Sequence, residues 1–299
     1  MHSASAVNAV RLAGGIGTSA QLVTAGVTPY ATRQAVEIGD LVRVRRGFYA
    51  VPDASPRALL AVRSGGRLAG LSAAESFGLW GGWSTPLHLC VSGHAGHVGG
   101  RSLPATRGVR LVDGTRAIVH WNDDRRDRDW CWRVSVERCV RQILRWHDAE
   151  TALAVVDTAL TAGLLRAGDV ERLAQSPSRV TVADLERCAA GAQSGVESLA
   201  RQRLQRAGLR VRLQPEVPGV GHVDLGIVGT MVYVEIDGYD YHSDPDQFTE
   251  DRRRDAEARR RGFVPLRFAA AQVRDAWPWA ERMVLGAVAQ TQVVAPFGR

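Results

Sequence analysis

The chain of 299 residues is long enough for two or three domains, and its 45% hydrophobic and 23% charged content is ordinary for a soluble globular protein. No apolar run approaches the ~20 residues that cross a bilayer, the N-terminus has no signal-sequence pattern, and the four cysteines include no C-x-x-C pair. We therefore expect a soluble cytoplasmic protein with reduced thiols. All 38 basic residues are arginine and the net charge is +7, which favours a phosphate-rich partner.

The first 56 residues predict a winged helix. A small apolar helix and a glycine-containing loop precede two short helices over 21–25 and 29–38, and an arginine-rich hairpin follows over 41–51. In a helix-turn-helix the second helix enters the major groove. We therefore expect base or phosphate contacts from exposed side chains of that helix and from the hairpin, namely Tyr30, Thr32, Arg33, Gln34, Arg43, Arg45 and Arg46. The alternative is a winged helix used only for packing, with its arginines on a solvated edge.

A resemblance favours DNA contact. The segment over 27–52, VTPYATRQAVEIGDLVRVRRGFYAVP, resembles the winged-helix domain of AbiEi-type antitoxins, which repress their own operons by binding DNA. The segment over 155–165, VVDTALTAGLL, is close to another pattern of AbiEi-like proteins and extends the resemblance to about the first 175 residues. The resemblance implies double-stranded DNA as a partner.

The middle third, residues 57–178, predicts an α+β domain. Helices are expected over 57–64 and 72–77, and a longer helical region over 134–174. Between them lie three strand-like runs, over 86–92, 109–112 and 117–120. The tryptophans next to apolar neighbours are expected to be core anchors. Cys90, His94 and His97 suggest a zinc site, but no fourth ligand lies at the usual spacing, and zinc is disfavoured.

Two alternating runs over 223–228 and 231–237 flank Gly229-Thr230 and predict a β-hairpin. If Leu225 pairs with Val234, one face of the hairpin carries six aliphatic side chains and Asp224 lies opposite Glu235 on the other face. Like charges at that separation repel. A divalent cation such as Mg²⁺ held between the carboxylates would explain the pair, and two acids on a solvated face are the alternative.

The C-terminal hundred residues resemble the PD-(D/E)XK nucleases, in the branch similar to very-short-patch-repair endonucleases. The resemblance rests on the hairpin acids with Asp237 and His242, on S-G-V-E ahead of them, and on D-R-R-R-D and G-F-V-P-L-R-F after them. It implies a metal-dependent endonuclease in which Asp224, Glu235 and the carbonyl of Ile236 hold Mg²⁺, with Mn²⁺ as a substitute. Glu197 would be the acid on the preceding helix, although Ser-x-x-Glu is also a capping box.

The same resemblance assigns the remaining residues. Asp237 stands where most members carry lysine and would act as a ligand or a base, and His242 would transfer a proton; the alternative for His242 is a surface histidine that closes the strand. Arg252 and Arg254 would clamp phosphate, or pair with the acids of their own helix.

The sequence thus predicts an α/β multidomain protein with a winged helix over 1–56, an α+β domain over 57–178, and a nuclease-like domain with a central mixed sheet over 190–299. The favoured function is a metal-dependent DNA endonuclease guided by the winged helix. The alternative is an AbiEi-like regulator whose nuclease-fold module is inactive. An RNA nuclease and a homodimer stay open, as does the choice between repair, defence and regulation.

Overall fold

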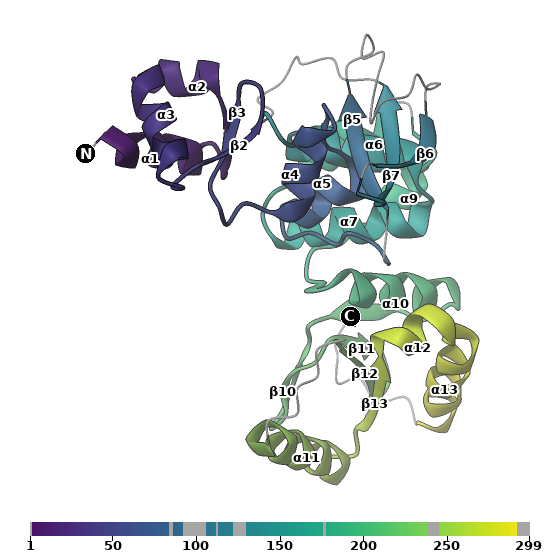
Figure 1. Ribbon diagram of the computed structural model, residues 1–299. Coiled ribbons are helices and arrows are strands. Elements are labelled where there is room, and N and C mark those ends of the chain that lie inside the picture. Colours follow the sequence, from purple (N-terminus) through teal and green to yellow (C-terminus); the bar gives the residue numbers. More distant parts are fainter. Residues whose placement is uncertain are drawn as a thin grey trace. The chain divides into compact units, whose positions relative to one another are not determined.

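A computed structural model describes residues 2–83, 86–91, 106–111, 113–121, 130–175, 178–238 and 245–291 (Figure 1). The chain forms two compact units, Met1–Trp146 and His147–Arg299. Both units contain helices and sheets, in agreement with the expected α/β class. No helix in the described part of the chain is both long and apolar enough to cross a membrane.

The N-terminal segment has the order of a winged helix. Its elements are α1 (His2–Leu12), β1 (Ile16–Thr18), α2 (Ser19–Thr24), α3 (Pro29–Glu37), β2 (Val42–Arg45) and β3 (Phe48–Ala50), with the strands in the order β1-β3-β2. The hairpin is present where the sequence predicts it, and β1 adds a third strand. Thr28 caps α3 by accepting from the Ala31 amide at 3.1 Å, and Pro29 follows in the first turn.

A tryptophan packs the winged helix against the rest of its unit. The indole Nε1 of Trp132 donates to the carbonyl of Ala13 at 3.1 Å. Gly14 has a φ of +79°, and a Cβ built on it would lie 1.8 Å from the ring of Trp130. Position 14 therefore requires glycine for two reasons: the positive φ disfavours other residues, and a Cβ would clash with the ring of Trp130.

The middle part of the first unit is a mixed sheet with helices. It consists of α4 (Pro56–Arg63), β4 (Arg67–Leu68), α5 (Gly70–Ser76), β5 (Leu87–Val91), β6 (Thr106–Arg110), β7 (Arg116–Trp121) and α6 (Val136–Trp146), with strand order β4-β5-β7-β6. Strands β5 and β7 are parallel and the other pairs antiparallel. Of the tryptophans expected as anchors, Trp132 is buried, whereas Trp130 is 37% exposed.

The three described cysteines of this unit are free, and Cys90 is fully buried within β5. His94 and His97, the other members of the disfavoured zinc cluster, lie outside the described residues.

The second unit begins with three helices, α7 (Ala149–Thr161), α8 (Ala167–Ala174) and α9 (Val182–Leu185). The sequence predicts the first two as part of the middle domain over 57–178. Helix α7 packs against α10 (Gly195–Arg206). Between them Arg201 donates to Asp157 at 2.6 Å, and both side chains are almost completely buried. Ser198 and the amide of Ala189 also donate to Asp157, so this buried carboxylate is well satisfied.

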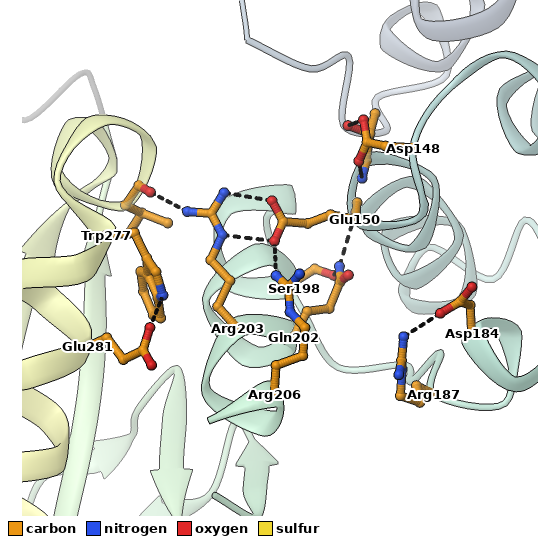
Figure 2. A network of polar contacts seen from close by, with 12 residues as sticks. Asp148, Glu150, Asp184, Arg187, Ser198, Gln202, Arg203, Arg206, Trp277 and Glu281 are labelled. Carbon is orange, nitrogen blue, oxygen red and sulfur yellow. Dashed lines mark hydrogen bonds and ion pairs between the residues drawn. The ribbon is translucent and has the colours of Figure 1, made fainter. Parts of the chain in front are cut away.

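A second polar network ties α10 to helices on either side of it (Figure 2). Arg203 donates to both carboxylate oxygens of Glu150, at 2.9 and 2.6 Å, and its third nitrogen donates to the carbonyl of Val273. Arg206 pairs with the same glutamate. Helix α10 is thereby held to α7 and to α12 (Ala270–Asp275) through one guanidinium.

The central sheet of this unit is mixed, as expected. Its strands, in the order β13-β12-β11-β8, are β8 (Val211–Leu213), β11 (Leu225–Ile227), β12 (Val232–Asp237) and β13 (Val264–Ala269). Strands β12 and β13 run parallel and the other pairs antiparallel. The remaining elements are the short pair β9 (Glu216–Val217) and β10 (Gly221–His222), α11 (Pro245–Arg260) and α13 (Trp277–Gln290).

Both faces of the hairpin strands are covered. Five of the six aliphatic side chains expected on one face are buried, and Ile236 is half-buried. On the opposite face Tyr233 is 1% exposed and packs with Ala258 of α11 and Phe263. The face that carries Glu235 is therefore an interior layer beneath α11.

We predict that Gly14→Ala lowers the free energy of unfolding by about 3 kcal/mol, because it combines left-handed strain with a clash against Trp130. The matched control is Gly26→Ala, where φ is +76° but a Cβ meets nothing within 4 Å. The control is expected to cost about 1–2 kcal/mol. Urea unfolding of both variants checks this, and equal losses would contradict the packing role of Trp130.

We also predict that Arg201→Met lowers the free energy of unfolding by about 3–5 kcal/mol, because Asp157 then keeps a buried charge without its partner. The double variant Asp157→Leu/Arg201→Met is expected to lose less than the single one. Urea unfolding of the set measures the coupling, and additive losses from the two sites would show that the ion pair is not the source of the effect.

Candidate functional site

The exposed face of α3 carries three of the four side chains expected to contact DNA. Tyr30 is 61% exposed and Arg33 is exposed, and the amide nitrogen of Gln34 donates to the hydroxyl of Tyr30 at 2.8 Å. Thr32 was expected to be exposed, but it is 6% exposed and its hydroxyl donates to the carbonyl of Thr28 at 3.2 Å. At α-helical spacing Thr32 falls on the core side of α3 with Ala31 and Ala35, so it supports the helix instead of facing outward.

The wing adds arginines beside this helix. Arg43 and Arg46 are exposed, whereas Arg45 is half-buried with its guanidinium 4.0 Å from the centroid of the Phe48 ring. Arg45 therefore stabilises the hairpin by a cation–π contact as well as carrying charge. Together the helix and the hairpin form a basic surface.

A second candidate site lies in the C-terminal sheet, where the predicted register is observed. Leu225 pairs with Val234 and Gly226 with Tyr233, so the residue before β11 meets Glu235. Glu235 is only 9% exposed, which excludes the interpretation that both acids lie on a solvated face. Asp224 is half-buried, and its Oδ2 accepts from the backbone amide of Ile236 at 2.8 Å.

Glu197 reaches the same place from α10. Ser194 caps the helix by accepting from the Glu197 amide at 3.1 Å, while the Glu197 carboxylate accepts from the Gln193 amide at 2.9 Å. The side-chain half of the expected capping box is thus shifted by one residue. The amide nitrogen of Gln214 lies 3.3 Å from Glu197 Oε2 and 3.2 Å from Asp224 Oδ1, and it donates to both.

Gln214 was not predicted as a site residue, and its backbone is strained. Its φ is +46°, and it is the one non-glycine residue with positive φ in the described part of the chain. Left-handed backbone costs an L residue about 1–2 kcal/mol. Strain of this kind is found at functional sites, where the surrounding structure maintains it. The sequence carries no signal for it beyond a glutamine ahead of Pro215.

Two arginines neutralise Glu235. Arg267 of β13, the Cα partner of Glu235 in the sheet, donates to Oε2 at 3.0 Å. Arg254 of α11 lies 3.4 Å from Oε1 and also donates to the carbonyls of Val220 and His222. Arg254 therefore has at least three partners inside its own domain.

The remaining predicted residues divide by position. Asp237 is half-buried, 3.8 Å from Arg267, which also pairs with Asp255 at 3.3 Å. Arg252 is exposed on α11. His242 lies outside the described residues, so its proposed role stays a prediction.

The crowding of carboxylates affects their protonation. Burial raises the pKa of the Glu197 carboxyl above its ordinary value, and the neighbouring Asp224 carboxylate raises it further. Burial also raises the pKa of Glu235, because the opposing effects of Arg267 and Arg254 do not fully offset it. Both acids therefore hold their protons more strongly when the protein is folded.

These residues fit a hard cation by chemical type, because carboxylate oxygens are the ligands that Mg²⁺ prefers. Their arrangement fits less well. Both oxygens of Glu235 have arginine partners, and among the described residues no group of three or more His, Cys, Asp or Glu side chains is placed to hold a metal ion. A cation at Asp224 and Glu235 would require Glu235 to release at least one arginine.

Comparison with known families identifies the N-terminal segment. Residues 10–52 match the family of AbiEi antitoxin transcriptional regulators. A search of curated proteins finds no match to the chain. The family match covers the winged helix from the end of α1 onward, and it includes every arginine of the wing.

We predict that Glu197→Gln raises the free energy of unfolding at pH 7 by on the order of 1 kcal/mol. With its raised folded-state pKa, Glu197 gives a stabilisation that is full below its ordinary value of 4.5 and is lost as pH rises through the folded-state pKa. Glutamine has no charge to lose. The increase in the free energy of unfolding should therefore vanish at pH 4. Thermal unfolding of both proteins between pH 4 and pH 7 measures it. Glu216→Gln, at an exposed position, is the control and should show no such trend.

Proposed function

We propose that the chain is a DNA-binding regulator that binds duplex DNA through the winged helix, with α3 in the major groove and the β2–β3 wing over the phosphate backbone. The observation that carries the proposal is the basic surface of α3 and the wing, within the segment that matches the antitoxin regulator family. Tyr30 and Gln34 would contact base edges, because they are hydrogen-bonded to each other on one face of α3, where Tyr30 is exposed and Gln34 is half-buried.

The charge distribution supports this function. The chain carries net charge +7, and the arginines of α3 and the wing are exposed or half-buried. Attraction to phosphate supplies most of the sequence-independent affinity for DNA, while contacts at base edges supply the preference for one site.

Gel shifts with DNA from the region upstream of the chain's own coding sequence test this function. We predict that Gln34→Ala reduces the preference for the bound site over unrelated duplex by about 1–3 kcal/mol, because bidentate amide contacts to a base discriminate by that amount. Gln290→Ala, at an exposed position of α13, is the control. Equal affinity of the wild type for all duplexes would contradict a site-specific regulator.

We propose metal-dependent hydrolysis of DNA as a second candidate function. The observation that favours it is that Gln214 joins Glu197 to Asp224, and that the strand register places Asp224 beside Glu235, as the resemblance to PD-(D/E)XK nucleases implies. Mg²⁺ bound there would lower the pKa of a water and stabilise charge on the phosphate. The ion pairs of Glu235 argue for the regulator as the first choice, since they occupy the oxygens that such an ion needs.

Plasmid nicking separates the two functions. If the hydrolytic proposal holds, Mg²⁺ or Mn²⁺ produces nicked plasmid, and EDTA or Asp224→Ala lowers the rate at least a hundredfold, about 3 kcal/mol of barrier. Glu216→Gln should cleave like the wild type. DNA binding without cleavage at any concentration of either cation would leave the regulator alone.

A further inference from the structure

A crevice of about 340 Å³ lies in the winged helix, between α2, α3 and the wing. Val23 and Val36 contribute apolar walls, and Arg33 and Arg43 enter from α3 and β2 respectively. Tyr49 of β3 contributes an aromatic wall with a hydroxyl. Ser19 and Thr32 also line it, so the crevice combines apolar walls and hydroxyl groups with two cationic groups from different elements.

The two arginines differ from Arg254 and Arg267 of the second unit. Arg254 and Arg267 are bound to carboxylates of their own domain. Arg33 and Arg43 are exposed. Among the described residues, neither guanidinium has a hydrogen-bond acceptor or an acidic partner. No acidic side chain lines the crevice. The positive charge of the crevice is thus available to bind an anion of another molecule.

We propose that this crevice seats a single phosphodiester of the DNA backbone, with Arg33 and Arg43 on the same phosphate and the deoxyribose against the valines. The inference rests on the proposed DNA-binding function and adds one specific contact to it. Guanidinium groups match phosphate oxygens in geometry, and the apolar walls suit the sugar carbons. Ser19 and Tyr49 also line the crevice with hydroxyl groups, which can donate to phosphate oxygens.

The number of phosphates contacted can be measured without knowing the bound sequence. The logarithm of the association constant for duplex DNA falls with the logarithm of salt concentration, with a slope of about −0.9 for each phosphate neutralised. Full-length protein is titrated with a 30-base-pair duplex of arbitrary sequence, over a range of KCl concentrations. If one phosphate is shared, Arg33→Ala and Arg43→Ala each keep one guanidinium on it and should weaken binding with little change of slope. The double variant should lose about 0.9 from the slope.

Two further variants make the test specific. Val23→Glu places a carboxylate at the mouth of the crevice without removing an arginine, and it should weaken duplex binding as strongly as the double variant does. Val23 is 59% exposed, so the fold should accept the change. Arg259→Ala, at an exposed position of α11, removes the same charge elsewhere and should leave the slope unchanged.

The outcomes are distinct. A slope change near 1.8 in the double variant would mean two separate phosphates and would overturn the shared seat. An unchanged slope in all three arginine variants would overturn it while leaving DNA binding intact. If the wild type binds no duplex at low salt, the regulator proposal and the seat fail together.

Discussion

The buried ion pair between Asp157 and Arg201 is the interaction on which the second unit depends. It locks α10 against α7, and Glu197 lies one helical turn before Arg201 on the same helix. The acid that reaches Asp224 through Gln214 is therefore positioned by a charge pair that no solvent contacts. Arg203 adds a contact with Glu150 of α7 and donates to the carbonyl of Val273 in α12, so α10 is held from two sides (Figure 2).

Arginine serves two purposes in this chain. In the second unit Arg201, Arg203, Arg254 and Arg267 satisfy buried or half-buried carboxylates and carbonyls. In the winged helix the exposed arginines face outward beside α3. Because arginines of the second unit neutralise the acids inside that unit, the exposed arginines of the winged helix remain available to a partner. This contrast, together with the family match over 10–52, favours regulation over hydrolysis.

Local patterns predicted much of the fold. Alternation with a period of two residues determined the pairing of Leu225 with Val234, and hence the position of Asp224 against Glu235. The helix boundaries near Pro29 and Ser194 followed from caps. The partners of the acids were missed because they depend on distant segments: Arg267 on the parallel register of β13, and Gln214 on a backbone conformation that no sequence pattern reports. Thr32 was misplaced because helix rotation decides which side faces the core.

The left-handed backbone of Gln214 lowers the stability of the fold, so the glutamine side chain must be kept for a reason other than stability. Glycine adopts such a conformation without a Cβ penalty, so laboratory selection for heat resistance alone would be expected to favour losing the glutamine side chain. Descendants selected for heat resistance would then keep Glu197 and Asp224 but lose the Gln214 amide that joins them. Whatever those descendants could no longer do would identify the task for which the glutamine is kept.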